Sequence, residues 1–421
     1  MRVGIHSVSS QSGRAFFVDM IEKRCQVYGY ARESIHGKEF IDTITEQKGI
    51  YLERPENKNR EGSKLVLLRD DAVGHDIHRL ANESDVIIIA HPSHFLRDTI
   101  KKLKEAGISK RKIPIILSPS RTFAVPYLWD ILGEGYPFVC FSTCPYSCKA
   151  PNSGSVYIKR RKRNWMVSLE GEFTKKNIKV LEELFPQAIF NRIPATTSIG
   201  NIGAVFHPGT YLLNYREIKI AEKEGREYSF YIEGIASKEK VAKQLEAVDQ
   251  VRLKIANYLG LQVFGLKDNP NEEQWLNMMN ILRNKEKEVN NDIENLRHLR
   301  HDYLKKINEA ITSAQHWLDY TYGVERIPEE ELQFTIVRTP TYKKRSVPQK
   351  RYVEEDIPTG LVPLLAIANR FNIDGSSIRQ IIEIYHKYYN SDLKSDWRDL
   401  KEFSTEYIYQ YLKGDFFKII D

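Results

Sequence analysis

Short runs of β-branched and aromatic residues alternate with amphipathic stretches through the first 190 residues. The runs expected to be strands are residues 3–8, 26–30, 65–68, 86–90, 113–117 and 138–141. Apolar positions at three- and four-residue steps predict helices between them, for example over 14–24 and 96–106. This alternation predicts an α/β domain over 1–190, built on a doubly wound, mostly parallel sheet with helices on both faces. In such a sheet a ligand binds at the carboxyl ends of the strands, near the point where the strand order reverses.

The pattern changes at about residue 191, where the alternation stops and long helical periods take over. One period covers 238–259 and ends at Gly260, a residue suited to the left-handed position after a helix. Others cover 364–371 and 378–389, and a last one begins at residue 404. The second half, 191–421, is therefore expected to be an all-helical C-terminal domain.

Within that half, the segment 271–315 is heavily charged and carries apolar residues at helical spacing. The apolar positions are Val289, Ile293, Leu296, Leu299, Tyr303, Ile307 and Ile311. One long amphipathic helix is the direct interpretation. Its apolar seam must pack either on the rest of the domain or on a second copy of the chain, so a homodimer is one of two alternatives.

Composition narrows the class of protein. A chain of 421 residues is long for one core, and 41% hydrophobic with 28% charged residues is typical of a globular protein. No apolar run approaches the roughly 20 residues of a membrane span, and no apolar signal segment opens the chain, so we expect a cytoplasmic protein without a membrane partner. The net charge of +7 does not require nucleic acid. The basic run 159–163 is expected to be a solvated turn between strand-like residues 155–158 and 165–169.

Four cysteines in a chain of this length do not make a disulfide framework. Cys140, Cys144 and Cys148 recur every four residues, which raises the alternative of a metal site. Pro145 interrupts the segment and no nearby histidine completes a usual ligand set. We therefore expect reduced thiols in a buried loop and no metal.

The loop 7–13 follows the first predicted strand, where a Rossmann-like domain places its glycine-rich phosphate turn. Serines stand in the places of the earlier glycines, and Gly13 alone matches the last one. The Ser10 hydroxyl and the first N–H groups of the following helix are candidates to bind phosphate, with an ordinary turn as the alternative.

The end of the second predicted strand is expected to meet the ribose of a dinucleotide. An acid there suits NAD, and an arginine suits the 2′-phosphate of NADP. Arg32 with Ser34 favours NADPH, whereas Glu33 would serve NAD if the register shifted by one residue.

Two segments far apart in the chain carry candidate chemistry. Residues 351–363 contain Arg351, three acids and two prolines ahead of an apolar helical run, and residues 198–209 contain Asn201 and a His-Pro pair at His207. Both resemble elements of the opine dehydrogenase family, namely its C-terminal signature and its Asn-x-x-x-x-x-His-Pro element. The resemblance runs in order through nearly the whole chain and is weakest in loop 7–13 and in 271–315. One departure is Gly203, where the family often has a second asparagine.

The resemblance implies an oxidoreductase that joins the amino group of an amino acid to a 2-oxo acid and reduces the imine with NAD(P)H. It implies that His207 is the catalytic acid/base, that Asp356 orients it, and that Arg351 and Asn201 bind substrate. The partners are then small molecules, with NADPH or NADH as cofactor.

Further cofactor residues follow from the same resemblance. Residues 145–149 resemble a Pro-Tyr-x-Cys-Arg stretch of the family, with Lys149 in place of the arginine. Family members hold the nicotinamide with the loop before this stretch, which makes Thr143 a candidate. Arg121 is another, at a position where octopine dehydrogenase has glutamine.

Alternatives remain open for these residues. Asp356 could be a helix N-cap, and Arg351 could form an ion pair with Glu354 or Glu355. Residues 141–143 and Arg32 also resemble the staphylopine-type branch, whose members make metallophores with NADPH, so a nicotianamine-like amine is an alternative substrate. The missing loop glycines leave a nucleotide-binding sensor without turnover as a further alternative.

Overall fold

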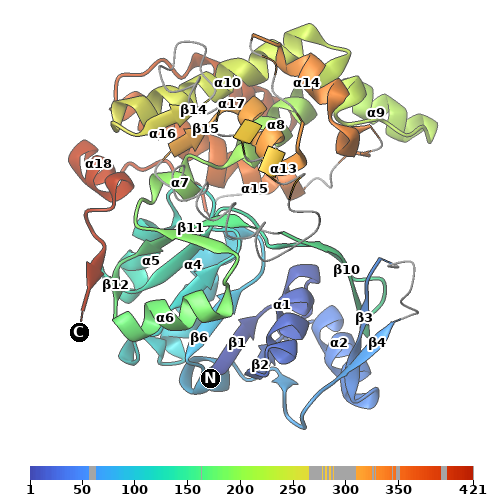
Figure 1. The fold of residues 1–421 in the computed structure, drawn as a ribbon, viewed down its shortest axis with the longest axis vertical. Coiled ribbons are helices and arrows are strands. Elements are labelled where there is room, and N and C mark those ends of the chain that lie inside the picture. Colours follow the sequence, from blue (N-terminus) through green and yellow to red (C-terminus); the bar gives the residue numbers. More distant parts are fainter. Residues whose placement is uncertain are drawn as a thin grey trace. The chain divides into compact units, whose positions relative to one another are not determined.

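The computed structural model describes residues 1–55, 63–162, 164–264, 310–324, 329–343, 345–347, 351–389 and 396–420, with a few single positions between 277 and 327. The chain forms two compact units (Figure 1). The sheet unit comprises 1–120, 124–197 and 414–421, and the helical unit comprises 121–123 and 198–413. No helix within the described ranges is long and apolar enough to cross a bilayer.

An eight-stranded sheet is the centre of the sheet unit, in the order β13-β11-β8-β7-β6-β1-β2-β5. Neighbouring strands run parallel except β8 and β11, which are antiparallel. The order reverses at β1, which pairs with β2 on one side and with β6 on the other, so the predicted doubly wound sheet is confirmed. The strands are β1 (Arg2–His6), β2 (Gln26–Tyr30), β5 (Val73–Gly74), β6 (Val86–Ile89), β7 (Ile115–Leu117), β8 (Phe138–Phe141), β11 (Trp165–Glu170) and β13 (Ala188–Asn191).

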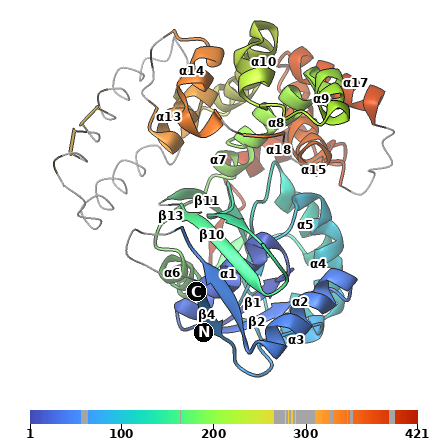
Figure 2. The same ribbon diagram turned by 90° about the vertical axis from the view of Figure 1, so that its right-hand side faces the viewer.

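The runs of apolar residues explain why these segments are central strands. All residues of β6, β7 and β8 are buried. A strand covered on both faces needs apolar side chains on both, so its sequence does not alternate with polar residues. Helices α3 (Ile77–Glu83), α4 (Leu96–Glu105) and α5 (Ala124–Leu132) pack in a row beside the sheet (Figure 2). The remaining helices of this unit are α2 (Ile35–Glu46), α6 (Lys175–Leu184), the short α7 (Ala195–Ser198) at its border, and the 3₁₀ turns η1 (Ser93–Phe95) and η2 (Ile108–Lys110).

Helix α1 (Gln11–Glu22) is enclosed between two sheets. It contacts β1 and β2 of the main sheet and β9 and β10 of a second sheet, whose order is β4-β3-β10-β9. All residues from 13 to 20 are consequently buried, which requires apolar side chains on every side of the helix. Arg14 is an exception, and its guanidinium donates to the carbonyls of Ser9, Asn152 and Ser155. The second sheet consists of β3 (Gly49–Glu53), β4 (Lys64–Leu67), β9 (Tyr146–Lys149) and β10 (Ser155–Arg161).

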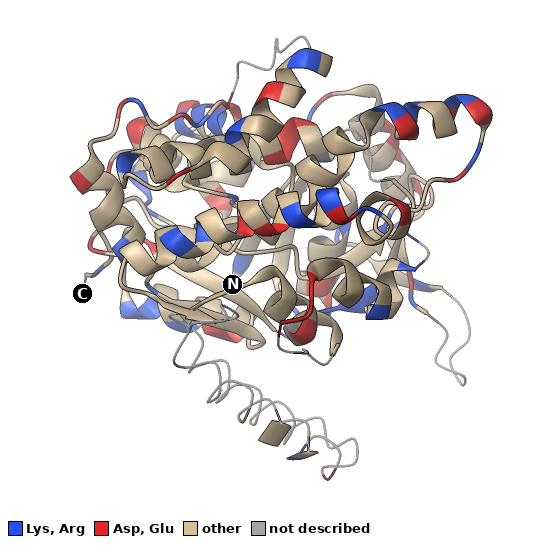
Figure 3. Cartoon of the chain, turned by 90° about the horizontal axis from the view of Figure 1, so that it is seen from above, with Lys and Arg blue, Asp and Glu red and all other residues tan. Residues whose placement is uncertain are grey.

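The second sheet corrects the expectation for the basic run 159–163. Strand β10 continues through Arg161, so Lys159 and Arg160 are exposed strand residues rather than part of a turn. Arg161 forms ion pairs with Asp19 and Glu22 of α1 at 2.8 and 2.9 Å. Elsewhere, basic and acidic residues are intermixed along the helices, in keeping with the small net charge (Figure 3).

The cysteines of the 140–148 region are free thiols. Burial raises the pKa of Cys148 to about 12 and also raises the pKa of Cys144. Both groups therefore stay protonated at neutral pH, whereas a metal ligand would have to be a thiolate. Within the described part of the chain, no three His, Cys, Asp or Glu side chains come together in a way that could hold a metal ion.

Helix α8 (Ile202–Leu213) is central to the helical unit, because it contacts α10, α15 and α17. Helices predicted from 238, 364, 378 and 404 are confirmed, and Gly260 has the expected positive φ of 66°. The helices are α9 (Tyr215–Glu224), α10 (Glu239–Tyr258), α13 (Ala314–Tyr322), α14 (Leu332–Arg338), α15 (Arg351–Asp356), α16 (Val362–Arg370), α17 (Ser376–Tyr388) and α18 (Thr405–Lys413), with the π-helical turns η3 (Ile232–Ala236) and η5 (Ile357–Leu361) and the 3₁₀ turn η4 (Pro340–Tyr342).

Strands β14 (Gln262–Phe264) and β15 (Ala310–Thr312) form a small parallel sheet in this otherwise helical unit. The long helix predicted over 271–315 falls mostly outside the described residues. Its last part is corrected, because Ile311 belongs to β15 and the next helix begins at Ala314. Buried Arg252 on α10 accounts for this local order, since it donates to the carbonyl of Thr312 and pairs with Asp249, which in turn accepts from the N–H of Ala314.

The two units are not consecutive stretches of the chain. The main boundary lies between Thr197 and Ser198 rather than after residue 190. Residues 121–123 belong to the helical unit although both flanking segments belong to the sheet unit. The last residues return to the sheet unit, where β16 (Lys418–Ile419) pairs with β12 (Glu172–Phe173).

Candidate active site

His207 and Asp356 form a hydrogen-bonded pair in the helical unit. The Nδ1 atom of His207 lies 2.7 Å from Oδ2 of Asp356, although the residues are 149 positions apart. Asp356 is completely buried, whereas 17% of the His207 side chain is exposed. The contact expected from the two motifs is present, and the catalytic roles of the two residues remain predictions.

Local structure brings the pair together. Asp356 ends α15, and the chain continues through the wider turn η5, in which Pro358 has no N–H for an ordinary helical bond. Gly360 lets this turn pack on α8, because a Cβ there would lie 2.7 Å from Cβ of Ala204. The alternative of a helix cap is wrong, since the backbone of Asp356 is helical and its side chain caps no N–H group.

Arg121 joins the pair from the three-residue segment that belongs to the helical unit. Its Nη2 lies 3.3 Å from Oδ1 of Asp356, an ion pair without the alignment of a hydrogen bond. Its Nε donates to Oε1 of Glu355 at 3.3 Å, and its Nη1 donates to Oδ1 of Asn201 at 3.1 Å. The prediction placed Arg121 with the cofactor-binding residues, but its contacts lie in the candidate catalytic cluster.

The cluster is a buried charge network. Arg121 is only 13% exposed, and Glu355 and Asp356 are 8% and 0% exposed. The Arg121 guanidinium therefore faces two neighbouring carboxylates in a place that is largely shielded from water. Loss of one partner from such a buried pair costs about 3–5 kcal/mol, because the other charge stays buried without compensation.

Asn201 contributes a further polar group next to the pair. It stands just before α8, and its Nδ2 is buried with no hydrogen-bond acceptor among the described residues. That atom lies beside Gly360, since a Cβ at 360 would be 3.4 Å away from it. A buried donor of this kind fits the predicted role of Asn201 in binding an acceptor on the substrate. Arg351 lies in α15, but its side chain is outside the described set, so its role also remains a prediction.

A second group of contacts, missed by sequence reasoning, fixes the Arg121 segment. The N–H of Thr122 donates to the carbonyl of Thr359 at 3.0 Å. The hydroxyl of Thr122 donates to the carbonyl of Ser198 at 2.8 Å. Buried Arg398, paired with Asp396 at 2.8 Å, donates to the carbonyl of Thr122 at 2.8 Å. No local sequence signal marks these partners, because each lies far along the chain from residue 122.

The predicted phosphate loop has its own internal bonds. Ser10 caps α1 by accepting from the N–H of Gly13, and its hydroxyl donates to the carbonyl of Ala90. Ser12 donates to the same carbonyl. The Ser10 hydroxyl is thus used within the protein, and the N–H groups of the first turn of α1 other than that of Gly13 are the donors that suit a phosphate.

Two positions of this loop have the backbone geometry that glycines provide in a dinucleotide turn. Ser7 has a φ of 63°, the left-handed conformation that glycine usually takes. Gly13 lies so close to the carbonyl of Ser7 that a Cβ would be 2.2 Å from its oxygen. Gly13 therefore has the close backbone approach that the last glycine of the motif provides.

The side chains expected near the cofactor's ribose follow β2. Arg32 is exposed, and Ser34 caps α2 by accepting from the N–H of Gly37. An exposed guanidinium beside a helix N-terminus suits a 2′-phosphate. The hydroxyl of Thr143, the residue expected near the nicotinamide, is already used within the protein, because it accepts a hydrogen bond from Lys162.

His6 is a residue of this edge that sequence reasoning missed, although its place at the end of the first strand was visible. Its ring lies 5.0 Å from that of Tyr30 and 5.2 Å from that of His91. Burial, together with the charges of His91, Lys102 and Arg32, lowers the pKa of His6 well below its usual range. The imidazole is therefore neutral at pH 7 and lies at the carboxyl end of β1.

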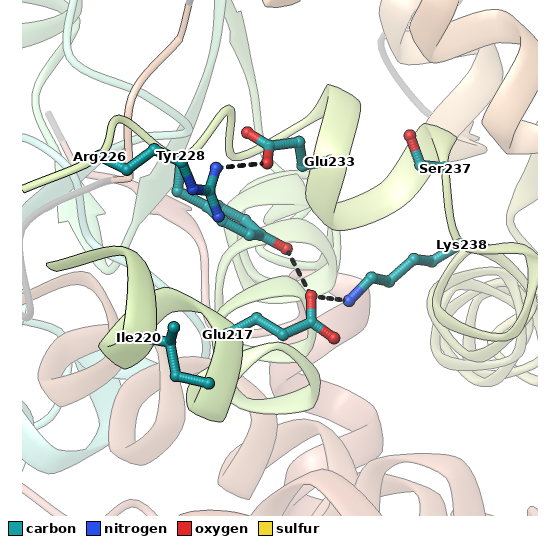
Figure 4. Close-up of a pocket in the computed structure, with 7 residues that line it drawn as sticks. All are labelled: Glu217, Ile220, Arg226, Tyr228, Glu233, Ser237 and Lys238. Carbon is teal, nitrogen blue, oxygen red and sulfur yellow. Dashed lines mark hydrogen bonds and ion pairs between the residues drawn. The ribbon is translucent and has the colours of Figure 1, made fainter. Parts of the chain in front are cut away.

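A surface cavity of about 290 Å³ in the helical unit has a lining that includes neither His207 nor Asp356 (Figure 4). Its charged residues pair with one another, Lys238 with Glu217 and Arg226 with Glu233. Because these charges are already matched, the cavity is a poor candidate for a site that recognises a charged substrate.

Two sequence comparisons point to opine dehydrogenases. The helical unit matches the model for "NAD/NADP octopine/nopaline dehydrogenase, alpha-helical domain" over residues 194–280 and 279–389. An opine dehydrogenase from Arthrobacter sp. (strain 1C) is 23% identical over 340 residues, which are 79% of this chain and 78% of that protein.

Solved structures agree with this result at the level of the fold. Octopine dehydrogenase in complex with NADH and agmatine aligns over 99% of this chain and 97% of its own, with a TM-score of 0.68 and 15% identity. Yersinopine dehydrogenase with bound NADP⁺ aligns over 98% and 94%, with a TM-score of 0.60 and 14% identity. These comparisons lead to one conclusion: residues 194–389 match the helical domain of octopine and nopaline dehydrogenases, and the chain has the fold of the two solved opine dehydrogenases.

Proposed function

We propose that this protein is an NAD(P)H-dependent opine dehydrogenase in which His207 is the acid/base and Asp356 orients it. The reaction joins the amine of an amino acid to the carbonyl of a 2-oxo acid and reduces the resulting imine. The observation that supports the assignment of residues is the 2.7 Å hydrogen bond between a partly exposed imidazole and a fully buried carboxylate.

Because Nδ1 of His207 is hydrogen-bonded to Asp356, Nε2 is the ring nitrogen that can exchange protons with a substrate. A buried carboxylate accepts the proton on Nδ1, so the neutral ring carries its lone pair on Nε2. Nε2 then takes a proton from the attacking ammonium group, and the neutral amine adds to the carbonyl carbon. The same proton goes to the carbinolamine hydroxyl, which leaves as water as the imine forms. One group performs both transfers, and histidine does so near neutral pH.

The nucleotide edge of the sheet unit fits a nicotinamide dinucleotide, by the close approach at Gly13 and the first turn of α1. When bound, the nicotinamide supplies the hydride that reduces the imine. We favour NADPH, because the exposed guanidinium of Arg32 suits a 2′-phosphate better than a ribose hydroxyl. Arg32→Gln should then weaken NADPH binding more than NADH binding.

For the substrate we propose a carboxylate anchor from Arg351 and a hydrogen bond from Asn201. A guanidinium binds a carboxylate through two parallel N–H groups, which suits the acid group of a 2-oxo acid. The buried Nδ2 of Asn201 supports a donor role toward the same substrate. A pure nucleotide sensor is not favoured, because nucleotide binding does not require a buried Asp–His pair in the other unit.

The test combines binding with turnover. Fluorescence titration with NADPH and NADH establishes the cofactor, and oxidation of the preferred one is then followed with pyruvate and mixtures of amino acids. One arm of the screen replaces the amino acids with larger amino-carboxylate amines. His207→Ala should bind the cofactor as the wild type does and lose turnover by about 10³-fold or more. Turnover retained within a few-fold in this variant would contradict the assignment.

A further inference from the structure

We infer that Arg121 is a positioning residue that holds the Asp356 carboxylate toward His207, and that Gly203 provides the space for its side chain. This inference rests on the proposed function of the His207–Asp356 pair. It concerns two residues to which neither the motifs nor the pair itself assigns this role.

The two oxygens of Asp356 have different partners. Oδ2 faces Nδ1 of His207 at 2.7 Å, and Oδ1 faces Nη2 of Arg121 at 3.3 Å. A carboxylate with only the histidine contact could turn about its Cβ–Cγ bond and exchange its oxygens. With a cation fixed on Oδ1, the plane of the carboxylate is set, and so is the direction from which the imidazole donates.

Arg121 is itself fixed at several points. Its Nε and Nη1 are used by Glu355 and Asn201, so three of its nitrogens have acidic or amide partners. Its backbone has a φ of 64°, and that of Phe123 has a φ of 54°, values that non-glycine residues rarely adopt. Hydrogen bonds from Thr122 and Phe123 to Thr359 and Ser198 hold the segment in that conformation.

Gly203 lies one helical turn before His207 on α8, next to the guanidinium. A Cβ at 203 would be 2.9 Å from Nη1 of Arg121 and 3.5 Å from Cε1 of His207. The first distance is too short, so any larger residue at 203 would push the guanidinium away from its partners. Arg121 and Gly203 are therefore expected to act as one unit.

The experiment is a double-mutant cycle with Arg121→Gln, Gly203→Ala and both together, and the exposed Arg216→Gln on α9 as a control. We expect Arg121→Gln to lower kcat about 10- to 100-fold, with KM for the 2-oxo acid within about threefold. Gly203→Ala should lower kcat about 10-fold alone and add less than about twofold to Arg121→Gln. Arg121→Lys, which keeps the charge but not the fork, should lie between glutamine and wild type.

A spectroscopic measurement separates this inference from the proposed function. The ¹⁵N signals of His207 in histidine-labelled protein report which nitrogen carries the proton, without any substrate. Arg121→Gln should change a single Nδ1–H form into a mixture, and Arg216→Gln should not. If the wild type turns over no opine substrate but this shift occurs, the proposed function fails and the positioning role stands. The inference is overturned by an unchanged His207 spectrum, by equal effects of Gly203→Ala in both backgrounds, or by a rise in KM at constant kcat.

Discussion

Asp356 is the residue on which the candidate site depends, since its carboxylate contacts both His207 and Arg121. Asp356→Asn should lower kcat about 10³- to 10⁴-fold, because an amide can donate to Nδ1 and favour the wrong tautomer. Cofactor binding should not change. Steady-state kinetics and NADPH titration measure the two effects.

Asp374 offers a matched control in the same unit. It is exposed and accepts a hydrogen bond from the N–H of Ser376 at 2.9 Å, a role that asparagine can keep. Asp374→Asn should leave turnover within about twofold. A comparable loss in both variants would mean that the effect of Asp356→Asn is one of folding.

His316 carries a prediction about acid stability. Burial lowers its pKa from 6.5 to about 3, so the folded protein keeps it neutral while the unfolded chain takes up a proton below 6.5. The unfolded state therefore binds more protons between about pH 3 and 6.5, and stability falls as the pH falls through that window. From pH 7.5 to 5.0 this group should cost about 2 kcal/mol.

The measurement is urea unfolding of the wild type and His316→Gln at both pH values. Glutamine does not titrate, so the variant should lose about 2 kcal/mol less stability on acidification than the wild type does. The pKa of His6 in the sheet unit is also lowered, so His6 also makes stability fall as the pH falls. Because His6 is present in both proteins, its contribution cancels in the comparison. Equal pH dependence in the two proteins would show that His316 is not buried in its neutral form.

At this scale, the sequence was sufficient for contacts between motifs and insufficient for contacts made by isolated residues. The pairing of His207 with Asp356 could be predicted, because each lies in a recognisable segment. Arg121 has no such segment, and its partners Glu355 and Asn201 are set by the tertiary fold. The hydroxyl of Ser10 was predicted to face phosphate, but its bond to Ala90 depends on the neighbouring strand.

Among the elements, the ends of the helices differ in a way that can be tested. After α9 and α13 the chain takes the left-handed conformation at Gly225 and Gly323. After α2 it does so at the exposed Lys48, with a φ of 53°. A residue with a Cβ pays about 1–2 kcal/mol in this conformation, whereas glycine loses more entropy on folding.

Lys48→Gly should therefore stabilise the protein by about 0.5–1 kcal/mol, measured by urea unfolding. The same substitution at the exposed Lys38, inside α2, should destabilise it by about 1 kcal/mol. Opposite signs for the two variants are the expected result. Destabilisation by both would indicate that the conformation at residue 48 carries no strain.

Apolar runs predicted the central strands because those strands are covered on both faces. Strands β3 and β9 were not predicted. Strand β9 pairs with β10, which follows it directly, whereas β3 pairs both with the next strand β4 and with β10, which is distant in sequence. Helical spacing was misleading at Ile311, where the contacts of buried Arg252 and the pairing with β14 determine a strand. The spacing of apolar residues alone does not identify so short an element.

For the molecule as a whole, two units could be predicted from length and from the change of pattern, but not how the chain passes between them. The return of residues 414–421 to the sheet unit has no signal in composition. Its basis is specific: Gly414 has a φ of 92° and would clash with the carbonyl of Arg192 if it had a Cβ. Phe417 stacks on Phe173, and β16 pairs with β12.

Removal of residues 414–421 should lower the melting temperature of the sheet unit by about 4–8 °C, from the loss of about 2 kcal/mol of apolar burial at Phe417. Calorimetry of the shortened and full chains measures the shift. Ile419→Ala, which trims an exposed side chain and keeps the strand pairing, should change it by less than about 2 °C. An unchanged melting temperature after truncation would show that this return segment adds no stability.

The passage of residues 121–123 into the helical unit has a consequence for recombination between relatives. A hybrid gene joined at the apparent border near residue 190 would take Arg121 from one parent and Gly203 with Asp356 from the other. If the second parent had a larger side chain at 203, that side chain would exclude the Arg121 guanidinium from its place in the hybrid. To take Arg121, Gly203 and Asp356 from the same parent, a single crossover must therefore lie before residue 121, well inside the sheet unit, or after residue 356.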